Sequence, residues 1–143
     1  MQLEALCNAV SDLEPYSISQ GDLRALAAGI ALPPERHQAR FLDVAENAWR
    51  LDVMLDPGDA ETWIYRRDER LRAPRSQLIG WRDSIPYMKP EVVLLFKAKA
   101  PREKDERDLE LCLAHLPEDA KRWLARSLQD HYPQHAWLRR LTG

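Results

Sequence analysis

The stretch PEVVLLFKAKAPREKDERDL, residues 90–109, decides how the C-terminal part of this chain folds. Pro90 suits the first turn of a helix, where its missing N–H leaves no hydrogen bond unmade, and five apolar residues follow it. Such a run also fits a buried strand, but the proline before it and the Lys-Ala-Lys-Ala ending favour a helix. Pro101 ends this helix, and a dense run of alternating charge begins there.

Three more helices are expected after this stretch, at residues 103–115, at residues 117–131 and close to the C-terminus. In each of them, apolar residues recur at the spacing of one helix face. The side chains predicted to face inward are Leu109, Cys112, Leu113, Trp123, Leu124, Leu128, Trp137, Leu138 and Leu141. The chain is therefore predicted to be helical from residue 90 onward.

Before residue 90 the chain shows the two-residue alternation of strands. Residues 49–56 are the clearest case, because Leu51 and Val53 point to one face and Asp52 to the other. Residues 15–19 and 38–44 also fit strands. These three segments predict a small sheet.

The remaining segments are less regular. The turn signal at residues 57–59 predicts that residues 62–66 return as the antiparallel partner of the clearest strand. Residues 2–11 fit a short helix. Residues 23–32 are ambiguous, because their alanines favour a helix that a glycine and two prolines interrupt, and residues 67–89 look irregular.

The length of 143 residues fits one domain, residues 1–143. The pattern of expected elements predicts an α+β fold, with a small antiparallel or mixed sheet in residues 1–89 and helices in residues 90–143. Hydrophobic residues make up 45% and charged residues 31%, as in globular proteins. The net charge of −2 gives no overall attraction to nucleic acid or to a membrane surface.

The sequence also predicts a location for the protein. No apolar run approaches the ~20 residues that a membrane span needs, and no signal peptide is recognised. We therefore expect a cytoplasmic protein. Cys7 and Cys112 are then expected to be free thiols rather than a disulfide.

Asp52 is the first candidate site residue, because it lies in the middle of the clearest strand, with Asp56 on the same face. A carboxylate on a rigid strand suits Mg²⁺, which prefers one or two carboxylates plus substrate phosphates. The alternative is an exposed strand face that has no metal-binding role. The metal hypothesis predicts that Asp52 lies on a central strand and faces a cleft near the helical part.

Lys97, Lys99, Arg102 and Lys104 are the second candidate, a basic cluster at the end of the first long helix. Basic side chains at this place suit an anionic partner such as a phosphate. Alternatively the cluster is a solvated helix end, since cations favour a helix C-terminus. In that case the basic groups pair with the neighbouring carboxylates Glu103, Asp105, Glu106 and Asp108.

Two other patterns carry less weight. A series of arginines from Arg66 to Arg82, interleaved with aromatic residues, fits a nucleic-acid surface, but acidic residues within it and the acidic chain speak against one. His131 and His135 have a metal-like spacing that Pro133 interrupts, so no zinc site is predicted.

Several of these segments together resemble a known family. They are residues 49–56, WIYRRD at residues 63–68, IPYMKPEVVLLFKAK at residues 85–99, REKDERDL at residues 102–109 and PQHAWL at residues 133–138. They are similar to bacterial proteins related to the aminoglycoside nucleotidyltransferases of the polymerase-β-like superfamily. The resemblance covers most of the chain from residue 12 onward.

The resemblance implies a fold and a chemistry. The family has a mixed sheet flanked by helices, and it uses Mg²⁺ to transfer a nucleoside monophosphate from a nucleoside triphosphate to a hydroxyl acceptor. By resemblance, Asp52 matches the third of three metal-binding carboxylates and is implied as a catalytic residue. Lys97, Arg102 and Lys104 match a basic motif that contacts the nucleotide phosphates or holds two lobes together.

One departure from the family changes the expected activity. The family carries a Gly-Gly or Gly-Ser turn and an Asp-x-Asp pair ahead of the third carboxylate, and this sequence has neither. The chain is then an amino-terminally short version of the fold, a fragment, or a descendant that no longer catalyses. We expect it to bind nucleoside triphosphate weakly and to transfer no nucleotide. The alternative is a non-catalytic binding or interaction module on the same scaffold.

The missing segment also predicts a partner. A sheet that lacks a strand leaves an exposed edge or an apolar patch, and proteins usually cover such surfaces. A homodimer, or another protein that covers the sheet edge, is therefore expected.

Overall fold

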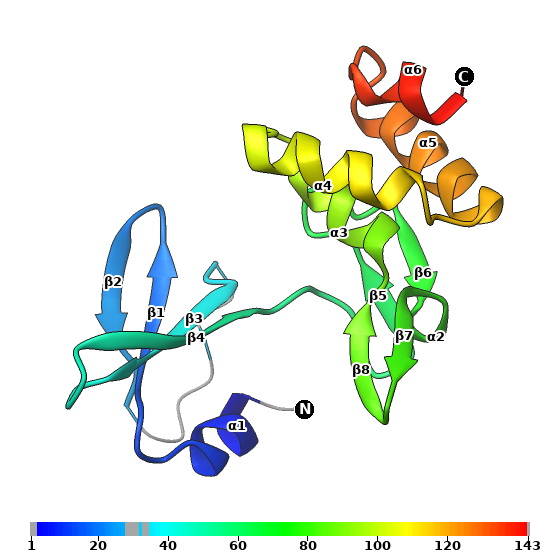
Figure 1. Cartoon of the computed structure of the whole chain (residues 1–143). Coiled ribbons are helices and arrows are strands. Elements are labelled where there is room, and N and C mark those ends of the chain that lie inside the picture. The colour runs from blue at the N-terminus through cyan, green and yellow to red at the C-terminus, as the bar shows by residue number, and fades with distance from the viewer. Residues whose placement is uncertain (1–2, 28–31, 33–34, 143) are drawn as a thin grey trace. The chain divides into compact units, whose positions relative to one another are not determined.

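The computed structural model describes residues 3–27, 32 and 35–142, which form two compact units (Figure 1). Unit 1 comprises residues 1–56 and unit 2 comprises residues 57–143. The predicted α+β class is confirmed: antiparallel sheets occupy the first part, and helices dominate after residue 90. The chain divides into these units between Asp56 and Pro57, well before the change from strands to helices. The single domain stays a prediction.

Unit 1 is a four-stranded antiparallel sheet with the order β2-β1-β3-β4, preceded by a short helix. Its elements are α1 (Leu3–Ala9), β1 (Glu14–Ser19), β2 (Asp22–Ala25), β3 (Gln38–Asp43) and β4 (Ala48–Met54). The three predicted strands are confirmed. The ambiguous segment at residues 23–32 begins as strand β2 instead of a helix, while residues 28–31 lie outside the described residues.

The buried face of this sheet carries small and apolar side chains in register. Ala39 and Phe41 of β3 are fully buried, and they lie opposite Val53 and Leu51 of β4. The pleat sends the intervening residues to the other face. Asp52 and Arg40, which lie opposite each other, are therefore placed on the more exposed face.

Unit 2 contains two strand pairs with the short helix α2 between them, and four more described helices follow (Figure 1, green to red). Its elements are β5 (Thr62–Ile64), β6 (Arg72–Pro74), α2 (Arg75–Leu78), β7 (Ile79–Arg82), β8 (Ile85–Met88), α3 (Pro90–Lys97), α4 (Glu103–Leu113), α5 (Glu118–His131) and α6 (Trp137–Thr142). The four helices predicted after residue 90 are all present. Pro90 occupies the first turn of α3, as expected.

The predicted pairing of residues 62–66 with the clearest strand is wrong, because β5 pairs with β6. A local loop explains the difference. The Asp59 carboxylate accepts hydrogen bonds from the backbone N–H groups of Glu61 (2.8 Å) and Thr62 (2.7 Å), and Ile64 N donates to Pro57 O at 3.2 Å. These bonds close residues 57–64 on themselves, so that β5 begins a new structural unit.

Residues 67–89 are also more regular than the sequence suggested, because β7 and β8 form a hairpin. Its two loop residues, Asp83 and Ser84, both have positive φ, as a two-residue type I′ turn requires. Gly80 lies opposite Tyr87, and a Cβ at residue 80 would stand 2.4 Å from the Tyr87 ring. Gly80, which suggested irregular structure, therefore leaves the space that the Tyr87 ring occupies on the opposite strand.

The core of unit 2 joins the helices to the β5–β6 pair. Trp63 and Tyr65 at β5 are buried together with apolar residues of the helices. The buried helix residues include Val92, Leu94, Leu95, Leu109, Leu124, Leu128 and Trp137. Helix α3 lies between α4 and α5 in this core and contacts both. The site residues predicted around α3 are therefore held on a packed scaffold.

Candidate functional site

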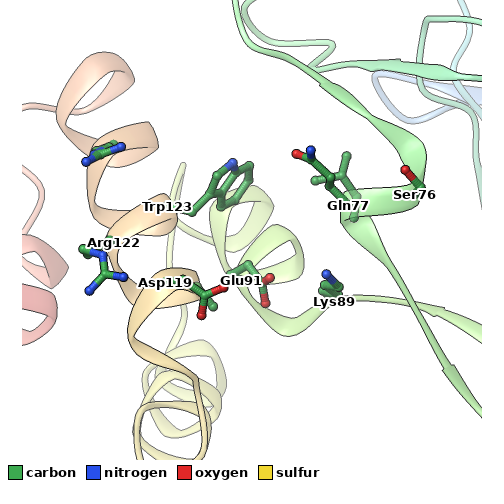
Figure 2. Close-up of a pocket in the computed structure, with 10 residues that line it drawn as sticks. Ser76, Gln77, Lys89, Glu91, Asp119, Arg122 and Trp123 are labelled. Carbon is green, nitrogen blue, oxygen red and sulfur yellow. The ribbon is translucent and has the colours of Figure 1, made fainter.

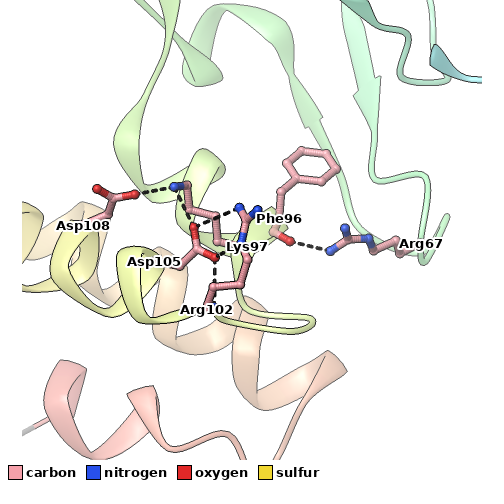
Figure 3. A network of polar contacts seen from close by, with 6 residues as sticks. All are labelled: Arg67, Phe96, Lys97, Arg102, Asp105 and Asp108. Carbon is pink, nitrogen blue, oxygen red and sulfur yellow. Dashed lines mark hydrogen bonds and ion pairs between the residues drawn. The ribbon is translucent and has the colours of Figure 1, made fainter. Parts of the chain in front are cut away.

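Lys97 and Arg102 of the predicted basic cluster form one network with two carboxylates of α4 (Figure 3). Lys97 Nζ at the end of α3 lies 3.0 Å from Asp105 Oδ1, and it also forms an ion pair with Asp108. Arg102 Nε lies 2.9 Å from Asp105 Oδ2. Two of the three predicted phosphate-binding residues are thus paired with carboxylates of their own chain.

Asp105 is the centre of this network, and its position follows from the start of α4. Helix α3 ends at Lys97, before Pro101, and α4 begins with Arg102 as its N-cap residue and Asp105 as its third helical residue. The Asp105 carboxylate reaches back to accept a hydrogen bond from Arg102 N at 3.0 Å, as in one half of a capping box. Asp105 is 1% exposed, so this carboxylate is buried and fully engaged.

The charges of the network stabilise one another. The hydrogen bond from Arg102 lowers the pKa of Asp105 well below its usual range, and Lys97 adds to the effect. Asp108 and Asp105 raise the pKa of Lys97. At neutral pH the network is therefore fully ionised, and it fastens the end of α3 to the start of α4.

Lys104, the third predicted phosphate-binding residue, behaves differently. It lies exposed in the first turn of α4, and no ion pair among the described residues involves it. Its neighbour Glu103 instead pairs with Arg107 one turn later. The three predicted residues therefore do not converge on one anion site within unit 2.

A second contact ties the segment after β5 to the C-terminal end of α3. Arg67 Nη1 donates a hydrogen bond to Phe96 O at 2.6 Å, and its guanidinium lies 5.4 Å from the Phe96 ring centre (Figure 3). The carbonyls in the last turn of a helix have no partner within the helix, so Arg67 supplies one. Tyr65 packs beside Phe96, and burial raises its pKa to about 12.

Several other arginines of the Arg66–Arg82 series contact loops of unit 2. Arg70 pairs with Asp68, Arg72 donates to Glu69 O, and Arg75 donates to Asp59 O. These guanidinium groups hold loops of unit 2 in place. They do not form the continuous basic surface that a nucleic-acid site requires.

Asp52 lies in unit 1, and the expectation of a central strand is wrong. Its strand β4 is the outermost strand of the described sheet. Both carboxylate oxygens accept hydrogen bonds from β3: Gln38 Nε2 lies 2.6 Å from Oδ1, and Arg40 Nε lies 3.1 Å from Oδ2. Arg40 stands directly opposite Asp52 in the ladder, so the strand register itself makes a cross-strand ion pair.

The donor groups around Asp52 do not fit Mg²⁺. Its neighbours on β3 are a cation and an amide nitrogen, which are not ligands for a hard cation. Across the described part of the chain, no three His, Cys, Asp or Glu side chains gather as a metal site would need. The catalytic and metal-binding role of Asp52, and its meeting with Lys97, stay predictions.

The structure adds a site that the sequence did not indicate. A groove with a volume of about 600 Å³ lies between α2, the start of α3, and α5. We call it the α5 groove, and its polar and aromatic lining includes Gln77, Lys89, Asp119, Arg122, Trp123 and Arg126. The apolar spacing of α5 predicted that Trp123 faces the core. In the structure Trp123 is only partly buried, and it lines the groove (Figure 2).

An exposed apolar surface also lies in unit 2. Large side chains of the β7–β8 hairpin are exposed, with Trp81 at 68% and Ile85 at 67%. A shallow pocket beside it is lined by Met88, Val93 and Leu111. On unit 1, Met54 of the outermost strand β4 is also exposed. Surfaces of this kind are where partners usually bind.

Comparison with known proteins adds no relative. A scan against protein-family models, a search of curated proteins and a search of solved structures each find no match to this chain. None of the described helices has the length and apolar character to cross a membrane. Both cysteines are free thiols, as the sequence predicts.

Proposed function

We propose that this chain is a nucleotidyltransferase-like protein that binds a nucleoside triphosphate and does not transfer its nucleotidyl group. One observation carries the proposal: segments that resemble the family pack together in unit 2. Tyr65 contacts Phe96, Arg67 caps the end of α3, and Lys97 joins α3 to α4. The basic motif of the family has two implied roles, and the contacts of Lys97 favour the one that holds structural elements together.

We expect no nucleotide transfer because, in the described part of the chain, the carboxylates that would bind the metal ions are not gathered in one place. Transfer in the family needs three carboxylates around two metal ions. Among the described residues no three possible metal ligands gather, and Asp52 is paired with Arg40. A concerted site that lacks two of its ligands loses most of its activity. The proposed function therefore includes no metal-dependent transfer to a hydroxyl acceptor. The free thiols fit a cytoplasmic location, which belongs to the same proposal.

The experiment compares Lys97→Met with Lys104→Met, two lysines of the same motif. ATP affinity is measured by calorimetry, and transfer is measured with Mg²⁺, labelled ATP and a mixture of hydroxyl acceptors. We expect Lys97→Met to lower the melting temperature because it breaks the network around Asp105, and to leave ATP affinity unchanged. Lys104→Met should change neither quantity.

Two results would contradict the proposal. The first is robust nucleotide transfer that Asp52→Asn abolishes, which would make the chain a complete enzyme. The second is a Lys97→Met variant with an unchanged melting temperature and a large loss of ATP affinity. That result would return Lys97 to a phosphate-binding role.

The exposed apolar side chains of the β7–β8 hairpin support the expectation that the chain binds a partner. We propose that a second copy of the chain, or another protein, covers the apolar surface around Trp81 and Ile85. Both edges of a two-stranded ribbon carry unpaired backbone groups, which also favours pairing with another chain.

A further inference from the structure

The charged side chains that line the α5 groove form no ion pairs among the described residues. Lys89, Arg122 and Arg126 line it together with Glu91 and Asp119. None of these five side chains takes part in an ion pair with a described residue. The cations at the other end of α3, by contrast, are paired with carboxylates. The groove therefore keeps its charged groups available to a ligand.

The walls of the groove are held by the core. Leu78 and Ala120 at its base are buried, with 6% and 7% exposure. Lys89 N donates a hydrogen bond to Leu78 O at 2.8 Å, which ties the end of α2 to the start of α3. Helix α5 packs on α3 through the buried Leu124 and Leu128. The groove is thus largely preformed, as small-molecule sites usually are.

Trp123 gives the groove an aromatic face. Figure 2 shows the indole of Trp123 on α5 directed toward Gln77, with Lys89 on the same side as Gln77. A partly exposed indole between polar walls suits stacking with a planar ring. An amide such as Gln77 both donates and accepts hydrogen bonds, so it suits the edge of such a ring.

We propose that the α5 groove is a binding site for a nucleoside phosphate, with the base on Trp123 and the phosphates near Lys89 and the two arginines. The choice of a nucleoside phosphate rests on the proposed function. The basic side chains exceed the acidic ones by one, which favours an anion. Glu91 and Asp119 accept hydrogen bonds from amino groups, which bases carry on their edges. The volume of about 600 Å³ suits a ligand of this size.

The test measures binding to the whole chain without Mg²⁺ or an acceptor. The probes are ATP, adenosine and inorganic tripolyphosphate, so that the ring and the anion are measured separately. Trp123→Leu should weaken ATP and adenosine binding by about tenfold, the scale of one aromatic–base stack. Lys89→Gln should weaken ATP and tripolyphosphate by about tenfold, because it removes a charge-assisted contact, and should leave adenosine unchanged.

Matched controls keep the result interpretable. Trp49→Leu removes an indole that is 44% exposed in unit 1, and Arg139→Gln removes an exposed cation on α6, so both should bind ATP as the wild type does. Trp123→Phe retains an aromatic ring and should keep most of the affinity, which separates stacking from any loss of packing. The indole N–H signal that disappears in Trp123→Phe should shift when ATP is added to the wild type.

The groove proposal is overturned if all variants bind ATP equally, or if Trp123→Phe loses as much affinity as Trp123→Leu. A wild type that binds no ATP at millimolar concentration would overturn both the groove proposal and the proposed function. Nucleotide transfer by the wild type would overturn only the proposed function. In that case, groove variants that weaken ATP binding would still support the α5 groove as the binding site.

Discussion

The two ends of α3 carry two kinds of charged cluster. At the C-terminal end, Lys97 and Arg102 meet a buried carboxylate, and the charges neutralise one another between two helices. At the N-terminal end, Lys89 and two arginines of α5 line an open groove without ion pairs among the described residues. Paired charges hold a structure together, whereas unpaired charges around an aromatic ring are available to bind.

This difference predicts that variants at the two ends of α3 will fail in different ways. Changes at the paired end should cost stability, and changes at the groove should cost binding. The expected effects decrease from the buried carboxylate outward.

Asp105→Asn should cause the largest loss of stability, because Arg102 loses its charged partner and Lys97 keeps only Asp108. The pKa of Asp105 is lowered in the folded state, so its contribution is present above the pKa of the unfolded chain and is lost as pH falls through the folded value. Urea unfolding from pH 7 to pH 2 should show wild type and variant converging below about pH 4. A constant difference across that range would contradict the assignment.

Lys97→Met should cost less, about 1–3 kcal/mol of unfolding free energy, because a buried carboxylate loses one of its charged partners but keeps Arg102. The methionine keeps most of the aliphatic stem, so packing changes little. Urea denaturation at pH 7 measures the effect. Arg139→Met on α6 is the control, an exposed cation with no ion pair among the described residues, and it should be close to neutral.

Ile85→Lys should change association rather than folding. Ile85 is 67% exposed at the start of β8, so a charge there meets water at little cost to the fold. If a second copy covers the hairpin, light scattering should show an assembly for the wild type and a monomer for the variant. A wild type that stays monomeric at high concentration would rule out self-association through this surface.

Lys89→Met should have the smallest effect on stability, within about 0.5 kcal/mol, because no ion pair in the described chain depends on this lysine. Its backbone N–H, which bonds Leu78 O, is unchanged by the substitution. Urea denaturation checks this expectation. A loss as large as that of Lys97→Met would mean that the two ends of α3 do not differ in the way proposed.

Short-range patterns in the sequence predicted much of the fold. The proline at the first turn of α3, the apolar spacing of α4 and α5, and the alternation in β1, β3 and β4 are signals within a few residues of one another. The possibility that the basic cluster pairs with Asp105 and Asp108 also followed from spacing, because these carboxylates lie close in sequence. Local geometry of this kind is determined by the chain itself.

Strand pairing and surface position were decided only by the tertiary structure. The partner of β5, the edge position of β4 and the hairpin around Pro86 depend on which segments meet, and alternation along one strand does not specify its neighbour. Pro86 is compatible with β8 because that strand pairs on one side only.

The α5 groove, like the strand pairing, could not be predicted from the sequence alone. Gln77, Lys89 and Trp123 come from three elements that are distant in sequence, and only packing brings them to one surface. The sequence by itself determined the local elements and the residue types of this protein. The tertiary structure decided which charges are neutralised and which remain open, because the pairing of charged groups depends on distances between elements.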